Sequence, residues 1–379
     1  MKKNIKQLSA IFLSMALAFG TTACGGNAGS VSSSAETSSE VASETAAETS
    51  AENTAEETAE ETASADSTDA TVTYPLTVTD QLGREVTIEK EPESLVSGYY
   101  ISTSLMIALG LDEKLVGVEA KADTRNIYKL SAPEILDLPS VGTAKEFDLE
   151  GCASLNPDLV IVPAKLKDSI PAMEELGLTV LAVKPENQDL LFDAIDLIDQ
   201  ATNTVSEGEK LKSYITDSLD NLTETLSSAE DTPSVYLGGN SALLETAGPA
   251  MYQSSLIENA KGANVAAEIS DSYWAEVSYE QILSWNPDYI VLASDASYTT
   301  DSVLTDSALA DCNAVKEGQV VKLPDEIESL DSPVPAGFLG SIYLASVLHP
   351  DLVSEEDYQK TASDFYETFY GFTPEVTAQ

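Results

Sequence analysis

From about residue 74 onward, short apolar runs alternate with longer stretches in which apolar residues recur every three or four positions. This alternation is typical of βαβ units, whose parallel strands are buried on both faces by helices. We predict strands at Leu95–Ser97, Leu115–Val118, Leu159–Val162, Val180–Val183, Val235–Leu237, Tyr289–Leu292 and Val320–Leu323. Before them, two alternating runs flank Gln81-Leu82-Gly83-Arg84 and predict a β-hairpin. The fold class predicted for the chain is therefore α/β.

One segment of this pattern occurs twice. Residues 150–162 read EGCASLNPDLVIV and residues 280–292 read EQILSWNPDYIVL, aligned without a gap at an offset of 130 residues. Each copy predicts a short helix, a stop and a buried strand, because a residue before proline is driven out of the α region. A repeated helix–strand unit predicts two similar Rossmann-like lobes, and the space between two lobes is a common place for a ligand.

A single long helix is predicted between the lobes, at residues 204–229. Leu211, Ile215, Leu222 and Leu226 form one apolar stripe along it. The first lobe then spans residues 74–203 and the second residues 230–379. A stiff helical link should limit the lobes to small relative motions. The last aromatic-rich segment, residues 364–370, predicts a helix that packs on the second lobe.

The N-terminal residues have the pattern of an export signal, predicted to span residues 1–23. Lys2, Lys3 and Lys6 precede an apolar stretch that is too short for a comfortable membrane span. Thr21-Thr22-Ala23-Cys24 resembles a bacterial lipobox, in which the cysteine is lipidated, although leucine is usual at the place of Thr21. Ordinary cleavage that leaves a free Cys24 is the alternative.

Residues 24–73 predict a disordered acidic tether. They are mostly Ser, Ala, Thr and Glu and contain no Lys or Arg, so they cannot bury enough apolar surface to offset the entropy of ordering. The net charge of −45 excludes nucleic acid as a natural partner. Cys152 and Cys312 are expected as two separate buried thiols, with a disulfide that clamps the lobes as the alternative.

Catalytic and metal-binding signals are weak. The single histidine, His349, cannot form the His-rich cluster that holds a bare transition metal, and it is expected at a helix end. We find no nucleophile elbow, phosphate-binding glycine loop or Cys–His pair. The sequence therefore predicts a binding protein without catalytic residues, metal site or cofactor, rather than an enzyme.

Ligands of open α/β sheets lie beyond the carboxyl ends of the strands, which identifies the loops that should form the site. In the first lobe these loops carry Tyr99, Tyr100, Lys121, Arg125, Lys145 and Lys165, and in the second Asn240, Tyr273, Trp274 and Tyr298. The basic residues predict an anionic ligand, and the aromatic residues suit a flat conjugated one. The alternative is that the lysines are ordinary solvated surface. Pro333, Pro335 and Phe338 are expected at the rim.

Four stretches together give the chain a family resemblance: the TDQLGREVTI hairpin, both Asn-Pro-Asp repeats, the segment 261–266 and the phrase EGQVVKLP. The chain resembles the substrate-binding proteins of ABC importers for iron chelates and cobalamin, whose two lobes are joined by one long helix. The resemblance implies that Glu150 and Glu280, one in each lobe, dock onto arginines of the permease. Stabilisation of a helix N-terminus by each glutamate is the alternative.

The resemblance also implies a lipid-anchored monomer on the extracellular face of the cytoplasmic membrane, in the Gram-positive form. Its expected ligand is an iron–siderophore or haem, followed by a corrinoid such as cobalamin and then by an oxyanion such as molybdate. A surface sensor or adhesin with the same fold is a rival function. A nitrogenase-like cofactor enzyme is another, but it would need more cysteine ligands than this chain has.

Overall fold

The computed structural model describes residues 71–269 and 274–374 of the 379-residue chain. They belong to one compact unit that spans residues 66–379. The predicted export signal, the lipidation site and nearly all of the tether lie outside the described residues, so these calls remain predictions.

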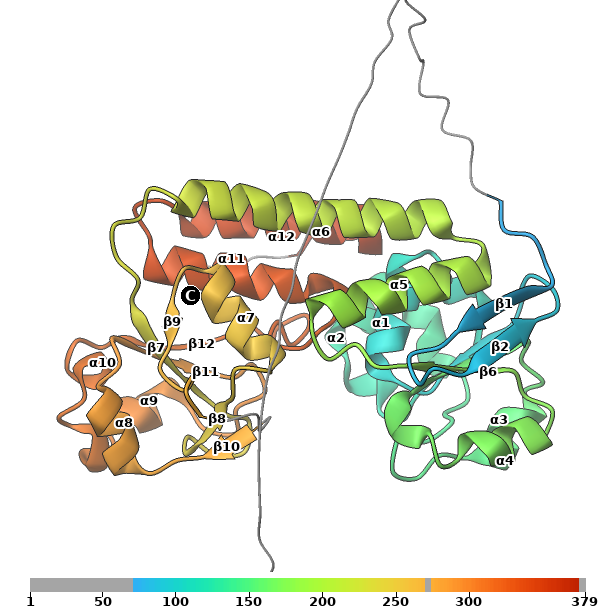
Figure 1. Ribbon diagram of the computed structural model, residues 1–379, viewed down its shortest axis with the longest axis horizontal. Coiled ribbons are helices and arrows are strands. Elements are labelled where there is room, and N and C mark those ends of the chain that lie inside the picture. Colours follow the sequence, from blue (N-terminus) through green and yellow to red (C-terminus); the bar gives the residue numbers. More distant parts are fainter. Residues whose placement is uncertain (1–70, 270–273, 375–379) are drawn as a thin grey trace, which may run out of the picture. The chain divides into compact units, whose positions relative to one another are not determined.

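The first lobe contains a hairpin and a four-stranded parallel sheet (Figure 1). The hairpin pairs β1 (Leu76–Thr79) with β2 (Glu85–Ile88), as predicted. The sheet has the order β4-β3-β5-β6, with β3 at Leu95–Ser97, β4 at Leu115–Gly117, β5 at Leu159–Pro163 and β6 at Val180–Val183. Every residue of β3, β5 and β6 is buried, as expected for strands covered on both faces. The helices of this lobe are α1 (Tyr100–Ala108), α2 (Asn126–Ser131), α3 (Leu149–Ser154), α4 (Ile170–Glu175) and α5 (Gln188–Thr202).

The second lobe has a six-stranded sheet of order β10-β8-β7-β11-β12, with β9 also paired to β7. Its strands are β7 (Ser234–Gly238), β8 (Glu245–Ala247), β9 (Ala263–Asn264), β10 (Trp274–Glu276), β11 (Tyr289–Leu292) and β12 (Val320–Lys322). Its first helices are α7 (Tyr252–Asn259), α8 (Tyr279–Trp285), α9 (Thr300–Leu304) and α10 (Asn313–Lys316). Strands β7, β9, β11 and β12 are parallel, but β8 and β10 form an antiparallel edge that sequence reasoning missed. These two strands have three residues each and no continuous apolar run, so they leave little pattern to detect.

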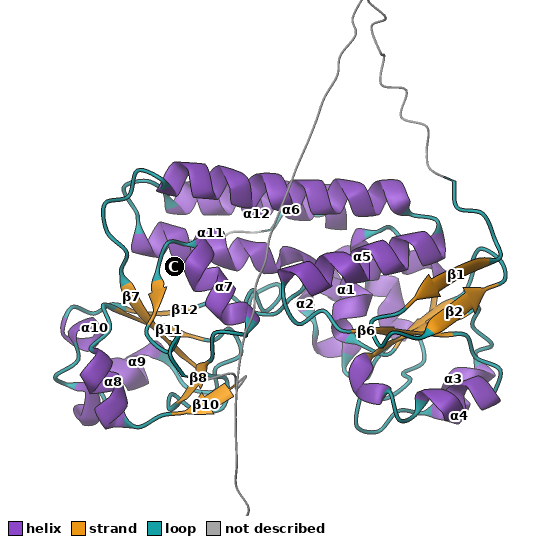
Figure 2. Cartoon of the chain, in the orientation of Figure 1, coloured by secondary structure: helices purple, strands orange, loops and turns teal. Residues whose placement is uncertain are grey.

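A single helix, α6 (Val205–Leu226), links the two lobes and confirms the predicted long helix. Its 22 residues correspond to a length of about 33 Å. Leu211, Ile215, Leu222 and Leu226 are all buried along one face. Figure 2 shows α6 above α5 of the first lobe, with α11 (Leu339–Leu348) and α12 (Glu355–Tyr370) of the second half on the same side of the sheets.

The last helix, α12, packs against both lobes rather than the second alone. Phe365, Tyr366, Phe369 and Tyr370 are buried, and the Tyr370 hydroxyl lies 2.9 Å from Oγ of Ser104 in α1. Because its C-terminal end contacts α1, α12 packs the two lobes together in addition to the covalent link through α6.

Phe338 belongs to the same aromatic core, with ring centroids 5.1 Å from Phe365 and 6.1 Å from Tyr214. It is 1% exposed, so its predicted place at a rim is wrong. Pro335 is also buried, in the short 3-10 helix that leads into α11. Cys152 and Cys312 are separate buried thiols, as predicted.

The two Asn-Pro-Asp segments form the same joint in both lobes. Asn156 and Asn286 adopt left-handed backbone conformations, with φ of 50° and 48°, and each follows a short helix. Asparagine tolerates this conformation better than most residues, and the proline after it prevents the helix from continuing. The chain therefore turns at once into β5 or β11.

The aspartate of each segment fastens that turn to the neighbouring strand. Oδ2 of Asp158 accepts hydrogen bonds from the backbone and the hydroxyl of Ser94, just before β3. Oδ2 of Asp288 accepts the same pair from Ser234, the first residue of β7. Burial raises the pKa of Asp158, but Lys90 and the hydrogen bonds from Glu93 and Ser94 outweigh it and lower that pKa. The repeat thus fixes where each sheet begins, and so where its carboxyl edge lies.

Candidate ligand-binding site

The carboxyl end of β3 places two tyrosines at the start of α1. Tyr99 is the residue before the helix and Tyr100 its first residue, and their rings meet edge to face with centroids 5.1 Å apart. The Ser97 hydroxyl donates to the carbonyl of Tyr99, and the Thr103 hydroxyl oxygen lies 2.7 Å from that of Ser97. These bonds fix the turn between the strand and the helix, and so the backbone that carries the two tyrosines.

Arg125 joins this pair from the loop after β4. Its guanidinium lies 4.1 Å from the centroid of the Tyr100 ring, and its Nε lies 3.5 Å from Oε1 of Glu119. Glu119 is buried and accepts hydrogen bonds from Thr103 at 2.6 Å and from the Tyr128 hydroxyl at 2.8 Å. Burial raises the pKa of Glu119, while these bonds and Arg125 oppose the rise. The arrangement holds a cation over an aromatic face at the edge of the first sheet.

The loop that follows β12 brings the second half of the chain to the same place. The Tyr100 hydroxyl lies 3.4 Å from Oγ of Ser332. Burial raises the pKa of Tyr100, and Asp331 and Asp295 add to the rise while Arg125 opposes it. Because Asp295 follows β11, the carboxyl edges of both sheets lie close enough to act on one tyrosine. Residues from both lobes therefore meet at this tyrosine.

Two hydrogen bonds join the lobes close to Tyr100 and Arg125. The amide of Ile127 donates to the carbonyl of Ile327 at 3.1 Å, and the Asn126 side chain donates to the carbonyl of Glu326 at 2.8 Å. Both donors belong to α2, directly after Arg125. These bonds hold the backbone next to Arg125 in a fixed position relative to the second lobe.

A second group of predicted residues gathers at the end of β7. The Tyr298 hydroxyl donates to the carbonyl of Gly239 at 2.9 Å, and the amide of Ser297 donates to the carbonyl of Asn240 at 2.9 Å. A Cβ at Gly239 would lie 3.0 Å from Cζ3 of Trp274, so this position needs glycine for the indole to approach. The Trp274 side chain, in β10, is 38% exposed. Asn240, Trp274 and Tyr298 thus form one rim of the second sheet.

Sequence reasoning missed a set of buried polar groups near Tyr100. The side chains of Tyr252, Gln253, Ser294 and Asp331 are buried, and the Tyr252 hydroxyl has no hydrogen-bond partner within the described residues. Burial raises the pKa of the Asp331 carboxyl, and hydrogen bonds with Ser294 and Gln253 oppose the rise. Burial also raises the pKa of the Tyr252 hydroxyl, and Asp331 adds to that rise. The four residues come from three separate loops and helices, so no local motif marks them. Ser294, two residues after β11, was the only one that the strand-end rule could have identified.

The predicted lysines do not form a cluster. Lys121, Lys145 and Lys165 are exposed and lie on loops of the first lobe. Their side chains form no hydrogen bond or ion pair with another residue in the described part of the chain. Their role in binding stays a prediction. Tyr273 lies outside the described residues.

Glu150 and Glu280 occupy equivalent exposed positions, each the second residue of a short helix. The N-cap residues before them are Asp148 and Ser278, whose side chains accept from the amides of Gly151 and Gln281. Figure 1 shows the helices α3 and α8 on the side of their sheets away from α6. The two glutamates therefore lie at equivalent positions in the two lobes. Their docking to the permease stays a prediction.

His349 ends α11 and is buried, as the expected helix-end residue, with Nδ1 3.8 Å from Oδ1 of Asp231. Across residues 71–269 and 274–374, no three His, Cys, Asp or Glu side chains are grouped so as to hold a metal ion. Among the helices of these residues, none combines the length and the apolar character that a membrane crossing requires.

Comparison with known proteins identifies the family. The profile of the family described as Periplasmic binding protein matches residues 95–327, and the chain belongs to this family. The molybdate-binding protein MolA of Haemophilus influenzae is 25% identical over 319 residues, which cover 77% of this chain and 90% of that protein. MolA is the cognate periplasmic binding protein of an ABC transporter, and its structure with molybdate superposes with a TM-score of 0.70, covering 79% of this chain and 99% of its own.

Two other relatives bind different ligands. The petrobactin-binding protein YclQ of Bacillus subtilis is 24% identical, with 65% of this chain and 80% of that protein covered. A cobalamin-binding protein of Halobacterium salinarum is 24% identical, with 70% of this chain and 72% of that protein covered. The family consists of substrate-binding transport proteins and not enzymes, which confirms the predicted class. The protein is a solute-binding protein of an ABC importer.

Proposed function

We propose that the protein captures an anionic metal chelate between the carboxyl edges of its two sheets and delivers it to an ABC permease. The observation that carries this proposal is Arg125, held over the Tyr100 ring by buried Glu119, where residues of both lobes meet. Nε of Arg125 is buried against Glu119, but about a third of the side chain is exposed. A cation in this position is available to a ligand carboxylate or phenolate.

The aromatic side chains favour a ligand with a broad apolar face. Tyr99 and Tyr100 lie at one edge, and Tyr298 and the exposed indole of Trp274 lie at the other. Such rings suit conjugated ligands, on which they stack. We therefore place an iron–siderophore or haem first and a corrinoid second. The relatives that bind petrobactin and cobalamin support both choices without deciding between them.

A small oxyanion such as molybdate is the second candidate, and the likeness to MolA favours it. An oxyanion needs several donors within one small pocket. Arg125 and the hydroxyls of Tyr100 and Ser332 would supply them at this site. Such a ligand would not need Trp274, which distinguishes the two candidates.

Anchoring and delivery complete the proposal. Lipidation of Cys24 would hold the protein at the outer face of the cytoplasmic membrane, with the acidic residues 25–73 as the tether. Glu150 and Glu280 would contact basic residues of the permease, because both are exposed at matching helix starts. The protein would act as a monomer, since one chain supplies both edges of the site.

A binding panel tests the ligand class. The purified full chain is titrated with a ferric siderophore, haem, cobalamin and molybdate, and binding is followed by calorimetry and by ligand absorption. We expect saturable one-to-one binding of a chelate, weakened at least about tenfold when Arg125, Lys121, Lys145 and Lys165 are all changed to Ala. Selective binding of molybdate would favour the second candidate. Binding of a chelate with unchanged affinity in the quadruple variant would refute the cationic site.

A further inference from the structure

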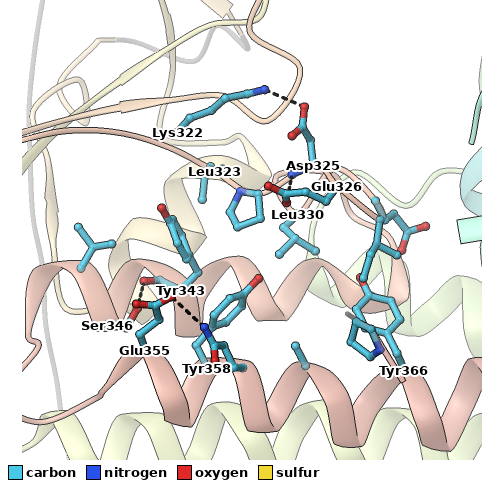
Figure 3. Close-up of a pocket in the computed structure, with 17 residues that line it drawn as sticks. Lys322, Leu323, Asp325, Glu326, Leu330, Tyr343, Ser346, Glu355, Tyr358 and Tyr366 are labelled. Carbon is cyan, nitrogen blue, oxygen red and sulfur yellow. Dashed lines mark hydrogen bonds and ion pairs between the residues drawn. The ribbon is translucent and has the colours of Figure 1, made fainter. Parts of the chain in front are cut away.

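A cavity of about 310 Å³ lies in the second half of the chain, apart from the candidate ligand-binding site. Its walls are the loop after β12, one face of α11 and one face of α12 (Figure 3). No residue that lines it belongs to the two edges described above. The volume is at the lower end of the range for small-molecule sites. Neither the fold nor the family relatives assign a function to this cavity.

Three tyrosines line one side of the cavity. The rings of Tyr343 and Tyr358 meet edge to face, with centroids 5.4 Å apart and an angle of 67° between their planes. Tyr366 lies two turns further along α12 and is 2% exposed. Figure 3 shows the three side chains on the same side as the two helices that carry them. Two rings that meet at this angle form a corner that can present π-electron density to a guest.

Acidic groups line the cavity on both sides. Asp325, Glu326 and Glu328 come from the loop after β12, and Glu355 comes from the start of α12. Lys322 is the basic residue among the lining side chains, and its Nζ is paired with Oδ2 of Asp325 at 2.7 Å. The remaining carboxyls therefore leave the cavity with an excess of negative charge.

Two of these carboxyls are held in place by neighbours. Oε1 of Glu355 accepts a hydrogen bond from Nε2 of Gln359 at 2.8 Å, one turn along α12. Oε1 of Glu328 accepts from the Ser104 hydroxyl at 2.6 Å. Both bonds fix the position of a carboxyl group in the cavity wall before any guest arrives.

Glu328 is the least satisfied of these groups. The residue is 9% exposed, and its Oε2 has no hydrogen-bond partner within the described residues. Burial raises the pKa of its carboxyl to about 7, while Ser104 and Arg125 oppose the rise. Burial raises the pKa of the Tyr366 and Tyr370 hydroxyls of α12 well above the ordinary value, and Glu328 adds to the rise in both. A nearby cation would stabilise the ionised form of a carboxylate that the protein leaves half satisfied.

We propose that this cavity binds a small organic cation, a quaternary or protonated amine, between the Tyr343–Tyr358 corner and the carboxylates of Glu328 and Glu355. Aromatic faces and carboxylates both attract such a cation, and a bulky ammonium loses little hydration on entering. A neutral molecule of the same shape would gain only the apolar contacts. The cavity is separate from the proposed ligand site, although Glu326 and Ile327 in its wall also accept the hydrogen bonds from Asn126 and Ile127 next to Arg125.

Calorimetric titration of the full chain with choline, at pH 8 and low salt, tests the proposal. We expect one saturable site per chain, and a response at least about tenfold weaker for the uncharged isostere 3,3-dimethylbutanol. Tyr358→Leu should weaken choline binding about tenfold, whereas Tyr358→Phe, which keeps the ring, should stay within about twofold of the original protein.

A pair of adjacent glutamates supplies a matched control. Glu355→Gln should weaken choline binding about threefold to fivefold, whereas Glu356→Gln, exposed on the same turn but outside the cavity, should have no effect. Both changes are at the surface end of a helix, so thermal melting should show intact folding. Absence of saturable binding, equal binding of the neutral isostere, or choline affinity unchanged in both Tyr358→Leu and Glu355→Gln would overturn the proposal.

Discussion

The two copies of the Asn-Pro-Asp segment form the same joint but precede different binding edges. In each lobe a left-handed asparagine ends a short helix, and an aspartate fastens the turn to the next strand of the sheet. Beyond the far ends of the strands the likeness stops. The first edge carries two tyrosines under an arginine, and the second carries an indole, a phenol and an amide. The repeat therefore preserves the scaffold and leaves the ligand chemistry free to differ.

The contrast between the shared joints and the unlike binding edges suggests a separate role for each. Residues that the repeat equates, such as Glu150 and Glu280, are suited to a partner that sees both lobes alike. Residues that it does not equate, such as Arg125 and Trp274, are suited to a ligand with two unlike faces. Each of the following variants tests one side of this comparison.

Charge reversal at both repeat glutamates should have the largest effect. In cells, Glu150→Lys with Glu280→Lys should reduce ligand uptake at least about tenfold, because two positive charges would then face basic residues of the permease. Ligand affinity of the purified variant should stay within about twofold. Glu175→Lys with Glu317→Lys, also one exposed glutamate per lobe, is the matched control and should transport normally. Normal transport by the first double variant would remove the docking role.

Substitution at the first edge should be next in size. Arg125→Ala should weaken binding of the chelate at least about tenfold in calorimetry, because it removes the cation that Glu119 and Tyr100 position. Lys121→Ala, on the same loop but exposed and unpaired among the described residues, should change affinity by less than about threefold. Equal losses in the two variants would mean that net charge, and not the position of Arg125, determines binding.

The two Asn-Pro-Asp joints should contribute unequally to the free energy of unfolding. Asp158→Ala should lower the free energy of unfolding by about 2–3 kcal/mol and Asp288→Ala by about 1–2 kcal/mol. Asp158 accepts one more backbone hydrogen bond, from Glu93, and is the less exposed of the two. Because the pKa of Asp158 is lowered on folding, its contribution is present at neutral pH and is lost as pH falls below about 4. Urea unfolding at pH 7 and pH 3 measures both differences, and a larger loss for Asp288→Ala would contradict this account.

The contact between Glu328 and Ser104 joins the lobes outside the repeat, and its contribution to stability should depend on pH. The pKa of Glu328 is raised to about 7 by burial, so its contribution to stability is full below its ordinary pKa of about 4.3 and is lost as pH rises to about 7. Glu328→Gln should therefore raise the free energy of unfolding by up to about 3 kcal/mol at pH 8 and leave it nearly unchanged at pH 4. Asp199, whose pKa is also raised to about 7, titrates in both proteins and cancels in the comparison. Parallel pH–stability curves would show that Glu328 does not titrate in this range.

Sequence reasoning succeeded where the pattern was local. Continuous apolar runs such as Val180–Val183 and Tyr289–Leu292 mark buried parallel strands, and both match the structure to the residue. The long helix was equally plain, because its apolar stripe extends over more than four turns. In contrast, β8 and β10 are too short to carry a pattern, and their pairing depends on a glycine that admits the Trp274 indole.

The site was only partly predictable for a related reason. The strand-end rule identified Tyr99, Tyr100 and Arg125, but it could not reveal that buried Glu119 positions the arginine. It also placed the lysines on the correct loops without showing whether they point to a common centre. Phe338 was misplaced because an aromatic residue after the last strand suits a rim and a core equally, and only the return of α12 decides between them.

Trp274 offers the most direct test that both edges hold one ligand. The chain has two tryptophans: Trp274 at the second edge, and Trp285 against Tyr236 in the core of the second lobe, with ring centroids 6.1 Å apart. In the Trp285→Phe variant, titration with the chelate found by the binding panel should quench the remaining fluorescence to saturation at one ligand per chain. Addition of Arg125→Ala should shift that curve at least about tenfold to higher ligand concentration. An indole signal that does not respond to the chelate, or a curve that Arg125→Ala leaves in place, would contradict a site shared by the two lobes.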